Sequence, residues 1–309
     1  MQFNINPYND DFAQNALDNN YVRIMFKPGK AVQTRELTQI QSILQNQIKQ
    51  FGDHVFQDGS PVIGGNLTLD NKTKFIKLLE TFENTDIEVE EFNGTVIRNT
   101  SGTVQAKVLA THFPTDGIPT LMVRYITGNE FIDGDTITIA GTTTRAQLIA
   151  SNSTGFGTIV SINEGVFYAD GFFVQVGNQT AVVSAYSTSA NVKIGLEINE
   201  EFIDSDIDAT LLDPAQESFN YQAPGADRYQ FSLILSTRPI DTVIDESKFF
   251  ELMRVESGAV TKQVKYPIYA ELEKTPPKTP AIHKFSFPLE IINSSPDNFR
   301  SIPSKVLKF

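Results

Sequence analysis

Residues 21 to 65 read YVRIMFKPGKAVQTRELTQIQSILQNQIKQFGDHVFQDGSPVIGG, and they contain the one long, well-bounded helix that the sequence predicts. We expect this helix to begin near Thr34, whose hydroxyl can accept a hydrogen bond from an unpaired amide of the first turn. It should end at Phe51, because Gly52 suits the left-handed conformation that closes many helices. Most of the remaining chain consists of short runs typical of β-strands. The predicted fold class is therefore mainly β (α+β), with one long N-terminal helix and several small β-sandwich or barrel domains.

An apolar stripe runs along the predicted helix. Its members recur at spacings of three, four, four and three residues, close to the 3.5-residue repeat of a coiled-coil seam. They are Leu37, Ile40, Leu44, Ile48 and Phe51. Glutamine is frequent on the opposite face, as expected where a helix face is covered by another protein or by a symmetry copy: Gln39, Gln45, Gln47, Lys49 and Gln50. The stripe predicts packing against another chain, and packing against the protein's own sheet fits the pattern equally well.

Composition excludes several classes of function. The formal charge of −12 and the pI near 4.8 oppose general nucleic-acid binding, which needs clustered Lys and Arg. The sequence contains no cysteine, which removes disulfides, thiolate metal sites and cysteine nucleophiles. We found no signal-like apolar run near the N-terminus and no run approaching the length of a membrane span. The sequence thus predicts a soluble chain with no nucleic-acid partner and no membrane insertion.

Three runs, in this order, carry a resemblance to a known family. They are residues 21 to 60 of the stretch quoted above, GVFYADGFFVQV at 165 to 176, and LLDPAQESFNYQAPGADRYQFSL at 211 to 233. The chain resembles a family of tailed-phage virion structural proteins. That family is a domain of unknown function at the N-terminus of tail-fibre and baseplate proteins of contractile-tailed phages, including cyanophages. The resemblance covers most of residues 1 to 274.

The resemblance implies a structural role. We expect a component of a contractile phage tail, either a baseplate protein or the baseplate-proximal root of a tail fibre, that acts by subunit–subunit binding. It implies no enzymatic activity, no cofactor, and a location in the virion after assembly in the host cytoplasm. Because fibres are commonly threefold, we expect a homotrimer that also binds other baseplate or tail-fibre proteins, with a dimer in a baseplate wedge as the next choice. A receptor-binding tail protein that holds host polysaccharide is the alternative, and a polysaccharide depolymerase is the third choice.

Changes in composition and residue pattern along the chain suggest five segments. They are an extended N-terminal arm (1–20), a helix-containing attachment domain (21–93 and 158–190), an inserted small β-barrel or sandwich (94–157), a second β domain (191–274), and an extended Pro-rich C-terminal tail (275–309). The tail begins where the resemblance stops, and it reflects either a natural shortening or a change of reading frame. Within the attachment domain we expect strands at Tyr21–Phe26 and Ile87–Phe92, and a hairpin that turns at Asp170-Gly171.

Few residues suggest a site. Arg23 and Arg35 bracket the helix start and could pair with carboxylates of a neighbouring chain or of the same chain. In the NYQAPGADR run, the candidate contact residues are Tyr221, Pro224 and Arg228.

Catalytic and metal chemistry has little support in the sequence. The three histidines, His54, His112 and His283, are scattered and form no metal-binding or catalytic motif. An alternating acidic run begins at Asp204 like a calcium loop, but Ala209 and Ala215 occupy the positions where an EF-hand needs glycine and glutamate. We therefore predict no catalytic residue and no metal site.

Overall fold

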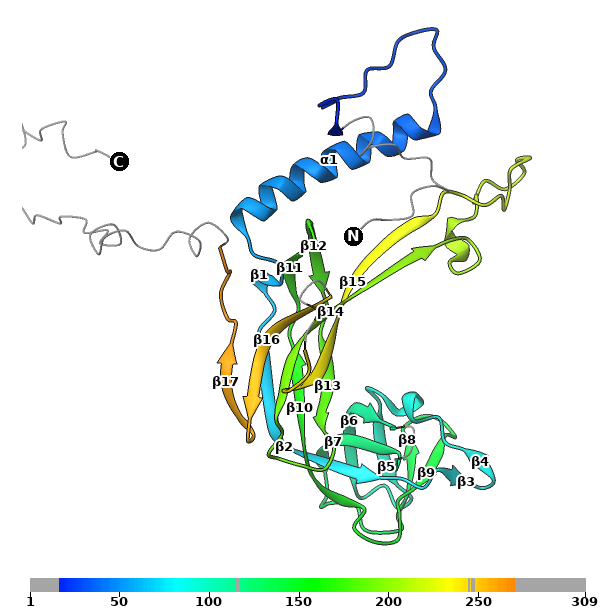
Figure 1. Cartoon of the computed structure of the whole chain (residues 1–309). Coiled ribbons are helices and arrows are strands. Elements are labelled where there is room, and N and C mark those ends of the chain that lie inside the picture. Colours follow the sequence, from blue (N-terminus) through cyan, green and yellow to red (C-terminus); the bar gives the residue numbers. More distant parts are fainter. Residues whose placement is uncertain (1–16, 115–116, 244, 246–247, 270–309) are drawn as a thin grey trace, which may run out of the picture. The chain divides into compact units, whose positions relative to one another are not determined.

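The computed structural model describes residues 17–114, 117–243, 245 and 248–269 (Figure 1). The predicted C-terminal tail and most of the predicted N-terminal arm lie outside these residues. The prediction of a mainly β fold is confirmed, because the described residues form many strands and a single α-helix, α1 (Thr34–Val55).

The strands are β1 (Ser60–Gly64), β2 (Leu67–Lys77), β3 (Thr81–Phe82), β4 (Thr85–Asp86), β5 (Val96–Asn99), β6 (Gln105–His112), β7 (Thr120–Thr127), β8 (Thr136–Ile139), β9 (Arg145–Gln147), β10 (Thr154–Ile162), β11 (Gly165–Ala169), β12 (Phe172–Val176), β13 (Gln179–Ser184), β14 (Val192–Ile203), β15 (Arg228–Pro239), β16 (Phe249–Glu256) and β17 (Ala259–Gln263). Two short 3₁₀ helices, η3 (Val89–Phe92) and η4 (Ala209–Leu211), complete the described elements.

The strands form two larger and two smaller antiparallel sheets. An eight-stranded sheet has the order β13-β10-β2-β7-β6-β5-β8-β9, and a four-stranded sheet has the order β15-β14-β16-β17. The hairpin β11-β12 pairs with β1, and β3 pairs with β4. Strands β5 to β9 belong to the predicted insertion, residues 94–157, and they join the same sheet as β10 through the β2–β7 pair. The proposed domain boundaries themselves stay a prediction.

The main core lies where the four-stranded sheet meets the hairpin and one end of the eight-stranded sheet. Its buried side chains come from β2, β10, β11, β12, β14, β15 and β16, and they include Phe167, Ile194 and Leu196. Two glutamines connect the sheets at their edges. The Gln179 side chain donates to the Leu233 carbonyl at 2.9 Å and accepts from the Leu235 amide at 2.6 Å. The Gln263 side chain donates to the Leu67 carbonyl at 2.9 Å. These bonds satisfy backbone groups that would otherwise lie at open sheet edges.

A second core fills the predicted insertion. It is formed by apolar side chains of β5 to β9, together with residues from the end of β2 and from η3, and Ile97, Phe92 and Phe131 are among its most buried members. The repeated short strands with glycine turns therefore build a packed unit.

The helix begins at Thr34, where the sequence predicted its start. Its N-cap is Gln33, whose backbone amide donates to the Glu36 carboxylate at 2.9 Å, so the capping role predicted for the Thr34 hydroxyl was wrong. Its last residue is Val55, so the predicted end at Phe51 was also wrong. Gly52 is a buried residue inside the helix, because a tyrosine ring packs directly against its backbone. The glycine serves close packing here and does not close the helix.

Two predicted strands do not form in the part of the chain that the structure describes. Residues 21–26 have no regular secondary structure, and residues 87–92 contain η3. Alternation in sequence does not make a strand unless a neighbouring edge supplies hydrogen bonds. The hairpin prediction is confirmed. β11 pairs with β12 across a two-residue turn in which Asp170 has φ 45° and Gly171 has φ 87°, the positive values that a type I′ turn requires.

Candidate subunit interface

The polar face of α1 packs on the β11–β12 hairpin. Near its middle, the Gln45 side-chain amide donates to the Gly171 carbonyl at 2.8 Å, and the Lys49 ammonium lies 3.0 Å from the Asp170 carboxylate. One turn later, the Tyr168 hydroxyl donates to the Asp53 carboxylate at 2.6 Å. The hairpin turn therefore holds the helix through charged and polar side chains.

These groups support one another electrostatically. Burial opposes the charged form of Lys49, but pairing with the Asp170 and Asp53 carboxylates raises its pKa above the ordinary value. Burial and the hydrogen bond to Asp53 raise the pKa of the Tyr168 phenol, so this hydroxyl stays a proton donor at neutral pH. Lys49 and Tyr168 therefore both keep their protons, and hence remain donors, at neutral pH.

Aromatic packing completes the attachment. The ring of Phe56, just after the helix, lies 5.9 Å from each of the rings of Tyr168, Phe173 and Tyr269, measured between centroids. A side chain at Gly52 would collide with the Tyr168 ring. Tyr168 is fully buried, so it has no room to move aside. The end of α1 is thus positioned closely on the hairpin.

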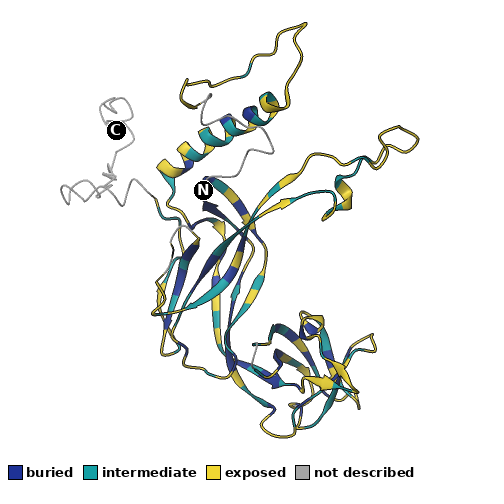
Figure 2. Ribbon diagram, turned by 45° about the vertical axis from the view of Figure 1, so that its right-hand side comes forward, coloured by how far each residue is buried: buried dark blue, intermediate teal, exposed yellow. Residues whose placement is uncertain are grey.

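The apolar stripe faces away from these contacts. Its side chains are 46 to 66% exposed at Leu37, Leu44, Ile48 and Phe51, and Ile40 is half-buried. The buried residues of the helix are instead Gln39, Ile43 and Gly52. Figure 2 shows exposed residues along the length of α1. A surface helix usually turns its apolar face to the core. Here a polar face is packed on the protein and the coiled-coil-like stripe is open.

Apolar exposure continues into the chain that precedes the helix. We call residues 21–33 the basic segment, because Arg23, Lys27 and Lys30 are its only charged residues. Its apolar side chains are exposed, with Val22 at 69% and Met25 at 81%. Exposed apolar patches of this kind mark interaction sites.

The structure places the remaining candidate residues in two regions. Arg23 and Arg35 are both exposed, one in the basic segment and one in the first turn of α1. Tyr221 and Pro224 lie in the connection between β14 and β15, and Arg228 is the first residue of β15. Arg228 donates to the Ala226 carbonyl at 2.6 Å, so its guanidinium helps to hold that connection.

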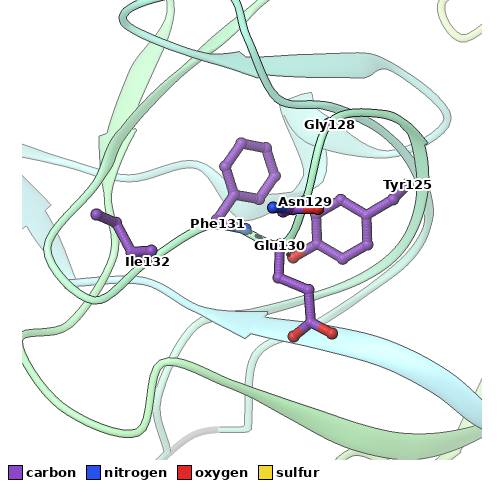
Figure 3. Close-up of a pocket in the computed structure, with 6 residues that line it drawn as sticks. All are labelled: Tyr125, Gly128, Asn129, Glu130, Phe131 and Ile132. Carbon is purple, nitrogen blue, oxygen red and sulfur yellow. Dashed lines mark hydrogen bonds between the residues drawn. The ribbon is translucent and has the colours of Figure 1, made fainter.

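A hollow in the predicted insertion is lined by Tyr125, Gly128, Asn129, Glu130, Phe131 and Ile132 (Figure 3). Its volume is about 540 Å³. The Tyr125 hydroxyl accepts the Phe131 amide at 3.2 Å, and burial raises the pKa of Tyr125 to about 12. Glu130 is paired with Lys74 at 2.7 Å. Phe131 is buried, the Tyr125 ring packs against it at 5.5 Å between centroids, and the carboxylate is paired. The hollow therefore offers little for sugar stacking or acid–base chemistry.

Within the described ranges, no group of three or more His, Asp or Glu side chains could hold a metal ion. The acidic run after β14 has a structural use. The Asp204 carboxylate accepts the amides of Asp206 and Ile207, and the Asp208 carboxylate caps η4 at Thr210. His283 lies outside the described residues. No α-helix in the described part of the chain has the length and hydropathy needed to cross a membrane.

The contacts that hold α1 were missed from the sequence. The sequence predicted that Lys49 lies on the polar face of the helix and that Asp170-Gly171 forms a turn. Nothing in the sequence indicated that the turn would lie beside the helix, because the two are separated by more than 100 residues. No pattern in the sequence indicated the hydrogen bond between the Tyr168 hydroxyl and the Asp53 carboxylate.

Comparison with known proteins assigns the chain to a family. No curated protein and no solved structure matches the chain. One family model, described as a domain of unknown function (DUF4815), matches residues 6–106 and 121–276. These ranges cover most of the chain, including α1, the β11–β12 hairpin and the β14–β15 connection. The chain therefore belongs to the DUF4815 family.

Proposed function

We propose that this protein is a structural subunit of a contractile phage tail, a baseplate protein or the baseplate-proximal root of a tail fibre, and that it acts by binding other subunits and not by catalysis. One observation carries the proposal: α1 is held by its polar face on the β11–β12 hairpin, and its apolar stripe is left open. A helix placed in this way presents a binding surface. The resemblance of three sequence runs to tail-fibre and baseplate proteins supplies the biological setting.

The size of the stripe indicates how it is used. Burying a large apolar side chain completely stabilises by about 1.5–3 kcal/mol, so four half-exposed side chains contribute about 4 kcal/mol per copy. Association costs about 4–15 kcal/mol in lost translational and rotational freedom. The burial free energy of two stripes packed together would only reach the lower part of the range of that cost. A stable assembly therefore needs three copies around an axis, or further contacts from the basic segment.

We favour a homotrimer for this reason. Three α1 helices around a threefold axis would bury each stripe against two neighbours, and the near-3.5-residue spacing is compatible with such packing. The β-sheets then act as rigid spacers between the axis and other tail proteins. The proposed setting is the virion, after assembly in the host cytoplasm.

The experiment compares two substitutions in one helix. Leu44→Asp puts a charge on the exposed stripe, and Gln50→Asp puts the same charge on an exposed position of α1 outside the stripe. Light scattering should give a reduced mass for the first variant and the wild-type mass for the second, while circular dichroism shows both folded. Equal masses for the wild type and Leu44→Asp would refute the stripe as a subunit contact. A Leu44→Asp variant that misfolds would place the stripe inside the protein's own fold.

A further inference from the structure

A two-stranded ribbon projects from the four-stranded sheet. β16 pairs with β14 only over Val192–Glu197, whereas β15 continues to pair with β14 as far as Ile203. We call residues 198–233 the arm; it comprises the distal ends of β14 and β15 and their connection. Figures 1 and 2 both show this ribbon extending past the end of the sheet.

The arm exposes large apolar side chains. Phe219 is fully exposed and Ile207 is 67% exposed, while Phe202 and Tyr221 are each close to half exposed. At the base of the arm the aromatic rings are packed instead, since Phe231 stacks on Phe172 of the hairpin with centroids 5.1 Å apart. The outer part therefore carries exposed apolar side chains, Phe219 and Ile207 above all, on a ribbon whose base is anchored. Such groups on a projecting element are typical of a contact site.

The charge of the arm points to the chemistry of its partner. Its connection and adjoining strand ends contain eight carboxylates and one arginine: Glu200, Glu201, Asp204, Asp206, Asp208, Asp213, Glu217, Asp227 and Arg228. Several carboxylates accept backbone amides of the arm, as Asp204, Asp208 and Asp213 do. A matching partner surface would be basic and would carry exposed apolar side chains.

The basic segment of the same chain has that composition. Residues 21–33 carry three cations and no carboxylate, and their apolar side chains Val22 and Met25 are among the most exposed of the described residues. We propose that the arm of one copy binds the basic segment of a second copy of this chain. This inference rests on the proposed function and deepens it by naming a contact between subunits other than the stripe.

The contact joins two different surfaces, so it is heterologous. A heterologous contact repeats from copy to copy and closes into a ring when the rotation allows it. A ring of three would place the arm of each subunit on the segment that leads into the next subunit's α1. The stripes would then meet at the axis, while the arms tie neighbouring subunits together outside it. Because the charges are exposed, salt should weaken the arm contact more than the stripe contact.

Cross-linking tests the contact directly, because the chain contains no cysteine. Met25→Cys and Phe219→Cys are prepared as separate full-length chains with tags of different mass, mixed, and oxidised. We expect a disulfide-linked heterodimer of the two chains. The matched control replaces Phe219→Cys by Val243→Cys, a residue that is 94% exposed elsewhere on the protein. A Met25–Phe219 product no more abundant than the control product would overturn the proposal.

Charge exchange separates this inference from the proposed function. Asp206→Lys with Glu217→Lys reverses the charge at two positions of the arm, and Lys27→Glu with Lys30→Glu reverses it at two positions of the basic segment. Each double variant should associate at least tenfold more weakly than the wild type at low salt, and a mixture of the two should regain association. If both double variants keep the wild-type mass while Leu44→Asp is monomeric, the arm contact is refuted and the stripe contact stands. The opposite pattern refutes the stripe and supports the arm.

Discussion

Replacing Gly52 by alanine tests the way α1 is held on the hairpin. The added Cβ would lie 2.6 Å from the Tyr168 hydroxyl oxygen and closer still to two carbons of its ring. Overpacking a tight site costs about 1–3 kcal/mol, and the upper end applies because Tyr168 is fully buried between aromatic neighbours. Alanine gains about 1 kcal/mol over glycine inside a helix. The net expected loss is about 2 kcal/mol, or roughly thirtyfold in the equilibrium between docked and undocked helix.

Amide hydrogen exchange is the suitable assay, because it resolves local opening from global unfolding. In the Gly52→Ala variant, amides of residues 45–56 and 165–176 should exchange about thirtyfold faster, while those of β14 and β16 keep their wild-type rates. The control is Gly177→Ala, where the added Cβ meets open space and no loss of protection is expected. Unchanged exchange of both α1 and the hairpin in Gly52→Ala would refute the docked arrangement, and with it the argument that the stripe faces outward.

Three further substitutions test other parts of the structure. Tyr168→Phe removes the hydrogen bond to Asp53 and should cost about 1–2 kcal/mol in chemical denaturation, with no change in the spacing of the aromatic rings. Gly195→Ala should cost the most stability, about 3 kcal/mol, because its Cβ would overlap the Phe250 carbonyl oxygen at the bulge between β14 and β16. A lower expression level and a lower melting temperature would show this loss. Burial opposes ionisation of Glu251, but the two 2.8 Å hydrogen bonds from Arg254 outweigh it and lower its pKa below the usual 4.5. The carboxylate therefore contributes stability that is present above its pKa in the unfolded chain and is lost as the pH falls through its pKa in the folded protein. Glu251→Gln should be less stable than the wild type by about 1 kcal/mol at pH 7 and equally stable at low pH.

Local signals in the sequence predicted the parts of the fold that depend on neighbouring residues. The Asp170-Gly171 turn follows from two positions that need positive φ, and the strands of the predicted insertion follow from alternation between glycine turns. The wrong predictions at Tyr21–Phe26 and Gly52 concern features that depend on distant parts of the chain. A strand needs a partner edge, and a glycine is used for close packing or for a left-handed turn according to what lies beside it. Both depend on residues that are distant in the sequence.

In the candidate interface, too, the sequence predicted the local features and missed those that depend on distant residues. The 3.5-residue spacing identified the stripe from Leu37 to Phe51, but two orientations of the helix fitted it equally well. The orientation is decided by Gln45 and Lys49, which contact the hairpin turn more than 100 residues away. In the arm, the sequence suggested only the candidate contact residues Tyr221, Pro224 and Arg228. Its ribbon form depends on where β16 stops pairing with β14, and no local pattern marks that position.

The mass of the purified wild-type chain, measured by light scattering across a dilution series, tests the central claim most directly. The account predicts an assembly of three times 34.3 kDa that persists on dilution and that partly dissociates in high salt. A mass of 34.3 kDa at every concentration would contradict it. The open stripe and the arm would then not join copies of this chain.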